Sequence, residues 1–349
     1  MSDAVAALPL GSRVVVRARL DASEGARAGG PTMTDAVGVL SERDERYVVV
    51  LTSRGPVRIS RHLVVAAKEV PPKPSRRGAA HLAISVENLQ RVAAPAWGAV
   101  ERERLGEWEL RASYGFTQRG NSVVPVGEPG LPLADAVVRV EQWYAARGLP
   151  AKFALAGPDG FSPEQDPLGA LLLQRGYRTG SVTLTLTGTT ATVAAEDPGG
   201  PPVVTQEELD AVWLDAYSGT RTVVPAAVES VLLGSPRVVF GSITPGGGLS
   251  QRLGLRRADA AGTRPIAVGR LGVAGGWAGL GAVWTDPAFR GRGLAAHLTA
   301  RLAATALDKG IHLIHLQVEH DNEAALRLYR RLGFLTHSSY AYLTQPAPG

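Results

Sequence analysis

Short runs of alternating apolar and polar residues fill the N-terminal part of the chain. The runs are rich in valine and are separated by polar turns, at 13–20, 35–41, 47–53, 56–60 and 63–70. Alternation with β-branched side chains is typical of half-buried strands. We therefore predict a small all-β domain over residues 1–71, of the SH3-like barrel kind. We favour a structural or docking role for it.

A different pattern begins after the proline-rich stretch at 70–78. Apolar residues at 133, 137, 140 and 144 form one helical stripe, which ends at Gly148. The other predicted elements of this middle segment are strands at 107–113, 121–126, 151–157 and 181–188 and a helix at 166–176. The segment therefore mixes helices and strands.

The last segment follows a second Pro/Gly-rich stretch at 196–202. Leu294, Leu298, Leu302 and Ala306 form a helical stripe that stops at Lys309-Gly310. The remaining predicted elements are strands at 264–273, 277–285, 311–318 and 334–343 and a helix at 322–333. The strand at 311–318 is apolar on both faces, as expected of a central buried strand.

The middle and last segments repeat the same order of elements. "RGLPAKFAL" aligns with "KGIHLIHLQ", and "LGALLLQRGY" aligns with "AALRLYRRLGF". We predict a duplicated fold, with one domain over 80–195 and the other over 203–349. Where the last copy has Tyr329, the middle copy has Leu172. We therefore expect the last copy to contain the catalytic residues and the middle copy to keep only the fold.

Composition narrows the possible functions. The chain has no cysteine, which excludes disulfides, thiolate metal sites and cysteine nucleophiles. No group of His, Asp and Glu has metal-ligand spacing, so we expect no metal. We see neither a secretory signal nor an apolar run of about 20 residues, so we expect a cytoplasmic protein without a membrane partner. The net charge of +5 is dispersed, which disfavours nucleic acid as a partner.

Candidate chemistry is concentrated in "DPAFRGRGLAAHL" at 286–298, where a strand runs through a glycine turn into a helix. The first N–H groups of a helix have no internal partners and suit a phosphate. Arg290 and Arg292 can add charge-assisted contacts. One interpretation is a dinucleotide turn, G-x-G-x-x-A at Gly291, Gly293 and Ala296, with Glu319 as the ribose acid. Too few residues follow this turn, however, to complete a doubly wound sheet. A P-loop is excluded because the turn lacks the G-K-[ST] of that motif.

Two motifs together favour a different cradle. R-x-x-G-x-A falls on Arg290, Gly293 and Ala295, and N-x-x-A-x-x-L-Y-x-x-x-G-F extends from Asn322 through Tyr329 to Phe334. This region resembles the GNAT superfamily of acyl-CoA-dependent N-acetyltransferases over roughly 204–345. The resemblance implies an α+β fold of tandem GNAT-like mixed-sheet domains after the barrel, with acetyl-CoA as the donor. The cofactor-binding residues that it implies are Val283, Trp284 and Thr285 for pantetheine, the amides of Arg290, Gly291, Arg292, Gly293, Leu294 and Ala295 for pyrophosphate, and Asn322 and Tyr329.

The catalytic assignments follow from position. Asn322 and Tyr329 are seven residues apart and share one helix face, so an amide can reach pantetheine and a phenol the thioester sulfur. A phenol is a weaker acid than a thiol, so Tyr329 is expected to act at least partly as a hydrogen-bond donor to the leaving thiolate. A backbone N–H near Val283 can polarise the thioester carbonyl. Glu319, at the end of the central strand, is the leading candidate for the base.

Other side chains have secondary assignments. His320 is an alternative base, whereas His312 and His315 are expected to be packed strand residues. Tyr217, Trp284 and Tyr340 are expected to line an acceptor pocket. The predicted function is acetyl transfer to an amine, which can be a protein lysine, a peptide N-terminus or a small amine. The alternative is a non-catalytic acyl-CoA-binding or docking protein.

Overall fold

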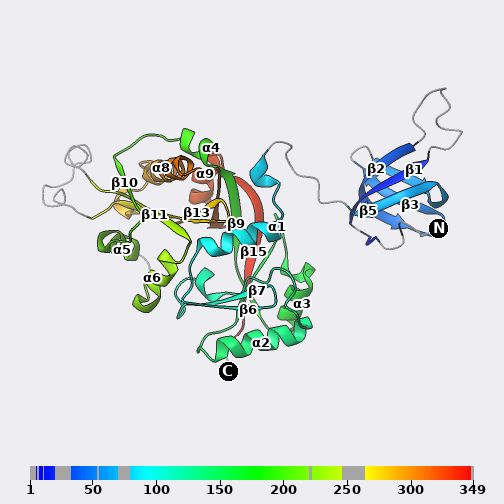
Figure 1. Cartoon of the computed structure of the whole chain (residues 1–349), viewed down its shortest axis with the longest axis horizontal. Coiled ribbons are helices and arrows are strands. Elements are labelled where there is room, and N and C mark those ends of the chain that lie inside the picture. Colours follow the sequence, from blue (N-terminus) through cyan, green and yellow to red (C-terminus); the bar gives the residue numbers. More distant parts are fainter. Residues whose placement is uncertain are drawn as a thin grey trace. The chain divides into compact units, whose positions relative to one another are not determined.

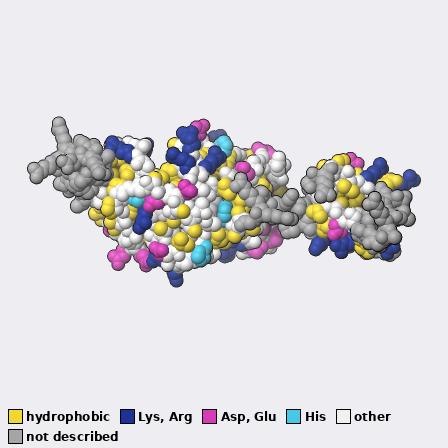
Figure 2. Space-filling view, turned by 90° about the horizontal axis from the view of Figure 1, so that it is seen from above, with side chains coloured by type: hydrophobic (Ala, Val, Ile, Leu, Met, Phe, Trp, Pro, Cys, Tyr) yellow, Lys and Arg dark blue, Asp and Glu magenta, His cyan; other side chains and the backbone are white. Residues whose placement is uncertain are grey.

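The chain folds into two compact units, Met1–Arg77 and Gly78–Gly349. The computed structural model (Figure 1) describes residues 5, 8–10, 12–19, 33–52, 55–69, 79–219, 222–245 and 264–346. In that part of the chain, no helix combines the length and apolarity needed to cross a membrane. On the face drawn in Figure 2, basic and acidic side chains are interspersed with apolar ones.

The N-terminal unit is all β, as predicted. Its strands are β1 (Arg13–Arg19), β2 (Met33–Arg43), β3 (Tyr47–Thr52), β4 (Gly55–Ser60) and β5 (Val64–Glu69). They form one antiparallel sheet in the order β4-β3-β2-β1-β5. Alternate residues such as Val14, Val16 and Leu40 are fully buried, because successive strand residues point to opposite faces. Its assignment as an SH3-like barrel stays a prediction.

The second unit is built on one mixed sheet. Its strands are β8 (Lys152–Pro158), β9 (Arg178–Thr189), β10 (Val203–Gln206), β11 (Arg237–Ile243), β12 (Ala267–Ala274), β13 (Trp277–Thr285), β14 (Leu313–Glu319) and β15 (Leu335–Thr344). Their order is β10-β11-β12-β13-β14-β9-β15-β8, and β13 runs parallel to β14 whereas the other neighbours are antiparallel. A separate hairpin pairs β6 (Glu101–Leu105) with β7 (Trp108–Ala112).

Helices cover this sheet. They include α1 (Val86–Ala93), α2 (Leu133–Ala145), α3 (Pro167–Gln174), α4 (Thr190–Ala195), α5 (Ala211–Ser218), α6 (Pro225–Leu233), α8 (Leu294–Asp308) and α9 (Glu323–Arg331). The predicted stripe of α8, from Leu294 to Ala306, is buried. Val239 of β11 packs into the cluster that contains α8, whereas its neighbour Phe240 packs into the cluster with α5 and α6. The sheet there lies between two helical layers.

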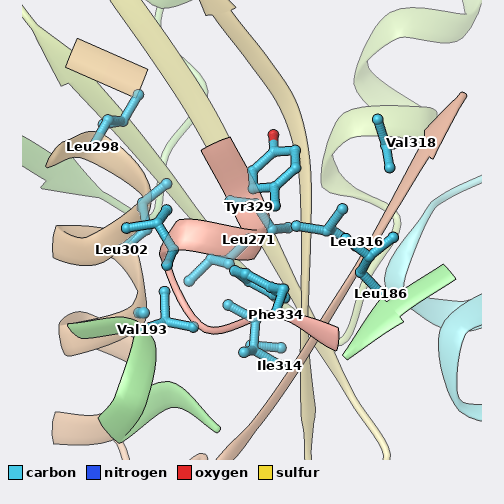
Figure 3. Close-up of a cluster of buried hydrophobic side chains, with 14 of the residues drawn as sticks. Leu186, Val193, Leu271, Leu298, Leu302, Ile314, Leu316, Val318, Tyr329 and Phe334 are labelled. Atoms are coloured by element: carbon cyan, nitrogen blue, oxygen red, sulfur yellow. The ribbon is translucent and has the colours of Figure 1, made fainter. Parts of the chain in front are cut away.

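The two predicted copies exchange strands. β9, from the middle segment, lies between β14 and β15 of the last segment, and β15 in turn pairs with β8 of the middle segment. The cores are shared as well. Leu186 of β9 and Val193 of α4 pack with Ile314, Leu316 and Phe334 in one cluster, drawn in Figure 3. Both copies therefore belong to one sheet, and the boundary predicted between them stays a prediction.

One predicted strand differs from the structure. Residues 121–126 form only two isolated bridges, from Val124 to Glu109 and from Val123 to Phe153. The buried side-chain amide of Asn121 bonds four backbone groups of the preceding loop. Pro125 has no N–H to donate to a ladder. Both effects keep this segment from continuing as a strand.

Candidate active site

The sheet opens between β13 and β14. The two strands pair from Trp277 opposite Leu313 to Leu280 opposite Leu316 and no further. Beyond that point β13 stays paired with β12, through a bulge where Ala282 has φ 54°, and β14 stays paired with β9. Because each strand follows its other neighbour, the pair diverges and leaves two backbone edges facing each other across a gap.

A cavity of about 680 Å³ occupies this opening. The predicted site residues among its lining are Val283, Trp284, Thr285, Arg290, Gly291, Gly293, Leu294, Ala295, Glu319, Asn322 and Tyr329. Arg292 is not part of the lining, and its guanidinium carbon lies 5.6 Å from the centroid of the Phe289 ring. The structure thus brings together residues that lie more than forty positions apart in the sequence.

The glycine turn forms one wall of the cavity. Gly291 and Gly293 have φ of 75° and 76°, where a residue with a side chain would be strained. A Cβ placed on either residue would meet no atom within 4 Å, so both face open space. Gly293 is the N-cap of α8, and no side chain of the described residues caps this helix. The N–H groups of the first turn can therefore receive an anion, which fits the predicted phosphate cradle.

Helix α9 forms the opposite wall. Asn322 precedes the helix as its N-cap, and its Oδ1 accepts a hydrogen bond of 3.1 Å from the Ala325 amide. The Nδ2 group is therefore the part of Asn322 that can donate to a ligand. Further along the same face, Tyr329 is 9 % exposed and packs edge-on against Phe334, with ring centroids 5.7 Å apart. Figure 3 shows the Tyr329 hydroxyl directed away from Phe334.

A smaller cavity of about 340 Å³ adjoins the first. Arg119, Ala282, Gln317 and Glu319 line both cavities. The Glu319 carboxylate, at the exposed end of β14, makes no ion pair or hydrogen bond with any described residue. It therefore lies where the two cavities meet, within reach of a molecule in either one.

The structure places the side chains with secondary assignments in different surroundings. Tyr217 and Tyr340 line the smaller cavity, whereas Trp284 lines the larger one. His320 is exposed and lines neither cavity. His315 is buried, as predicted.

The prediction that His312 is a packed strand residue is wrong. His312 is exposed and precedes β14, and its carbonyl accepts a hydrogen bond from the Thr190 amide. The apolar run that indicated a strand from 311 therefore begins to pair only at Leu313.

Sequence reasoning missed the contribution of the middle segment. Trp97, Gln118 and Arg119 line the smaller cavity, and no motif marks them. The signal that marks this loop is structural and cannot be read from the sequence, because it is the left-handed backbone of Tyr114 and Thr117, with φ of 52° and 61°. Left-handed backbone at residues with side chains is sparsely populated and is concentrated at functional sites.

Positive charge accumulates around Trp97. The guanidinium carbons of Arg119 and Arg270 lie 4.8 and 5.1 Å from its ring centroid. Arg270 is fully buried and donates to Leu232 O, Ala96 O and Ser235 Oγ, which are all neutral acceptors. Burial, with the positive charge of Arg119 in second place, lowers the pKa of Arg270 from 12.5 to about 9. Arg270 therefore stays protonated at neutral pH.

Comparison with known proteins agrees with this geometry. An "Uncharacterized N-acetyltransferase YobR" from Bacillus subtilis is 24% identical over 261 residues, which are 74% of this chain and 97% of that protein. The "Probable histone acetyltransferase Rv0428c" from Mycobacterium tuberculosis is 34% identical over 154 residues, 44% of this chain and 46% of that protein. A solved "GCN5-related N-acetyltransferase from Kribbella flavida" has the same fold at 17% identity, with a TM-score of 0.52 over 75% of this chain and 96% of that one.

The fold, the opened strand pair and these relatives define a GNAT-type acetyltransferase. Within that class, the chain belongs to the family described as "Probable histone acetyltransferase Rv0428c C-terminal", whose sequence model matches residues 84–343. GNAT acetyltransferases use acetyl-CoA as co-substrate and act on an amine acceptor. In the described residues, no group of three or more His, Asp or Glu could hold a metal ion.

Proposed function

We propose that the chain transfers an acetyl group from acetyl-CoA to a primary amine by direct attack, in the opening between β13 and β14. The observation that carries this proposal is the cavity itself. An uncapped helix N-terminus lies on one side of it, a tyrosine hydroxyl lies on the other, and at its end lies a carboxylate that pairs with none of the described residues.

The donor would lie across this opening. Its pyrophosphate would bind the first-turn amides of α8, next to Gly291 and Gly293, where several N–H donors and the helix dipole act on one anion. Its pantetheine arm would extend along Val283–Thr285, where β13 has diverged from β14. The Nδ2 group of Asn322 would donate to a pantetheine carbonyl from the facing helix.

The chemistry proposed is a single acyl transfer. The neutral amine attacks the thioester carbonyl carbon, the new C–N bond forms and the C–S bond breaks. Glu319 takes the proton that the amine nitrogen loses. Tyr329 donates a hydrogen bond or its proton to the departing thiolate. Holding both reactants side by side supplies a large share of the acceleration, because the attack becomes effectively unimolecular.

The donor site is tested by Gly293→Glu, with Gly310→Glu as its matched control. Gly293 and Gly310 both have φ of 76° and open space around a new side chain, and they lie at opposite ends of α8. Each change should cost about 1–2 kcal/mol of stability from backbone strain. Only Gly293→Glu places a carboxylate at the phosphate cradle, and we expect it to weaken acetyl-CoA binding at least 100-fold by calorimetry.

The remaining outcomes are separable. Equal acetyl-CoA affinity in the two glycine variants would contradict the donor site. Saturable acetyl-CoA binding without thiol release from any amine would favour the alternative, a non-catalytic acyl-CoA-binding or docking protein. Thiol release that depends on added amine supports transfer.

A further inference from the structure

The smaller cavity is placed to hold the acceptor. It shares Arg119, Ala282, Gln317 and Glu319 with the larger cavity, so a molecule inside it lies against the proposed thioester site. Its volume of about 340 Å³ is at the low end for small-molecule sites and is too small to hold a folded domain. The acceptor is therefore a compact molecule, or the end of one.

Aromatic side chains form part of the walls. Trp97, Tyr217, Tyr340 and Tyr342 line the cavity. The rings of Tyr340 and Tyr342 meet edge-on at 5.2 Å, and the Tyr340 hydroxyl bonds Gln317 Oε1 at 3.3 Å. The rest of the lining is mainly polar and consists of Ala282 with Thr117, Gln118, Arg119, Thr183, Gln317 and Glu319. The cavity therefore suits a polar molecule that can rest on aromatic rings.

Two opposite charges face this cavity without pairing. Among the described residues, the Arg119 guanidinium makes neither a hydrogen bond nor an ion pair, and it rests on the face of Trp97. Glu319 is the one carboxylate among the lining residues, and it forms no ion pair with Arg119. The Arg119 side chain is partly buried, and a buried charge is costly unless a counter-charge reaches it. The Glu319 carboxylate is exposed. Each of the two is therefore available to an opposite charge on a ligand.

The surroundings make the cavity positive overall. Arg270 lies behind Trp97, and Lys152 lies behind Gln118 and Tyr342, at 3.2 Å from Gln118 Oε1 and 5.7 Å from the Tyr342 ring centroid. Arg111 is buried and donates to Ser122. The surrounding positive charges would repel a ligand that carries only an ammonium group. A ligand that also carries an anionic group would be attracted through that group.

We propose that the acceptor is an amine that carries its own carboxylate, as a free amino acid does, with the carboxylate on Arg119 and the nitrogen beside Glu319. This inference rests on the proposed transfer from acetyl-CoA and adds the class of acceptor. The planar guanidinium binds a carboxylate through two parallel hydrogen bonds. Arg119 thus turns the amine toward the thioester and selects for the carboxylate.

The test compares acceptors that differ only in the carboxylate. Thiol release is measured with the twenty standard L-amino acids, and the best three are compared with their carboxamides and their decarboxylated amines. Rates are expressed per concentration of neutral amine, because the carboxylate also changes the pKa of the nitrogen. We expect kcat/KM to be at least tenfold higher for the amino acids.

Arg119 variants locate the source of that preference. Arg119→Gln should reduce the preference to near one, mainly by raising KM, and Arg119→Lys should keep part of it. Arg139→Gln is the matched control, since Arg139 is exposed on α2 and should leave the preference unchanged. The affinity for acetyl-CoA should be the same in all four proteins.

Several results would overturn the inference. Equal kcat/KM for the amino acids and their carboxamides would contradict it and leave transfer to amines intact. Loss of acetyl-CoA affinity in Arg119→Gln would assign Arg119 to the donor instead. If no amine supports thiol release, binding of the amino acids to the CoA complex is measured by calorimetry. Binding that needs both the carboxylate and Arg119 would support the acceptor site and refute the proposed acetyl transfer. If the amino acids do not bind in this way, both the acceptor site and the transfer are refuted.

Discussion

The Tyr329 ring packs in the core, and its hydroxyl faces the larger cavity. The ring packs against Phe334, while the hydroxyl points the other way (Figure 3). Tyr329→Phe keeps the packed ring and should lower kcat by about 100-fold, the size expected for loss of a general acid. Steady-state thiol release measures the loss, and a denaturant titration checks that the variant is folded.

A second tyrosine provides the control for that experiment. The Tyr177 hydroxyl bonds Glu141 at 3.1 Å in the middle segment and lines neither cavity. Tyr177→Phe should lower stability by about 1 kcal/mol, the typical value of a lost hydrogen bond, and leave kcat unchanged. An unchanged kcat in Tyr329→Phe would remove Tyr329 from the chemistry.

His315 gives the fold a defined sensitivity to acid. Both ring nitrogens are buried and have no hydrogen-bond partner among the described residues. Burial, and secondarily the charge of Arg119, lowers the pKa of His315 from 6.5 to about 3. Since the unfolded chain takes up the proton more readily, the stability tied to this residue is complete above pH 6.5 and is lost as the pH falls from 6.5 toward 3.

Replacing His315 removes that sensitivity. Relative to the wild-type chain, His315→Leu should gain about 2 kcal/mol in free energy of unfolding between pH 7 and pH 5, since one pKa unit is worth about 1.4 kcal/mol. Denaturant titrations at these two pH values measure the difference. A difference that stays constant with pH would show that His315 titrates normally, and His315→Gln repeats the test with a polar side chain.

At the scale of single residues, the sequence predicted those site residues whose positions depend only on the local turn and helix. The spacing of Gly293, Asn322 and Tyr329 follows from one turn and one helix face, and the structure places all three on one cavity. Arg119 was not predictable, because its place depends on a long-range fold that brings a middle-segment loop to the end of β14. No local pattern distinguishes it from the many other arginines.

Among the elements, β9 has the largest structural consequence. It pairs with β14 from Leu313 to Glu319 on one side and with β15 on the other. A fragment of residues 203–349 would lack β9 and expose two strand edges together with the surface that Leu186 covers. We expect this fragment to aggregate or remain unfolded, as measured by circular dichroism and size-exclusion chromatography.

The matched control is a fragment of residues 78–349. It removes the N-terminal unit, which has its own buried cluster around Val14 and Leu40, and it keeps all strands of the mixed sheet. This fragment should fold cooperatively and retain kcat/KM within about twofold of the whole chain, because every lining residue of both cavities lies within it. A stable, active 203–349 fragment would show that β9 is dispensable.

The periodicity of the sequence predicts which residues form strands but not which strands become neighbours. The strands at 178–189, 313–319 and 335–344 all satisfy the same burial pattern whether each copy closes on itself or exchanges with the other. The elements that were predicted in the last segment therefore agree with the structure to within a few residues, while the exchange was not foreseen. The helices α5 and α6 were not predicted from the pattern.

For the whole molecule, the exchange of strands between the two copies explains why the middle copy is needed although it lacks the cradle motif. The middle segment supplies β9 to the sheet, Leu186 and Val193 to the core, and Trp97 and Arg119 to the smaller cavity. The residues proposed to bind the donor all belong to the last copy, although Arg119 of the middle copy also lines the larger cavity, and the proposed acceptor site needs both copies.

The place of β9 in the sheet also has a consequence for synthesis. A ribosome completes β9 at Thr189, but its two neighbours begin only at Leu313 and Leu335. At about 5–20 residues per second, this strand waits on the order of ten seconds with both edges open. Unpaired edges are templates for aggregation. The nascent chain therefore offers a holding chaperone an open strand at the segment that later joins the two halves.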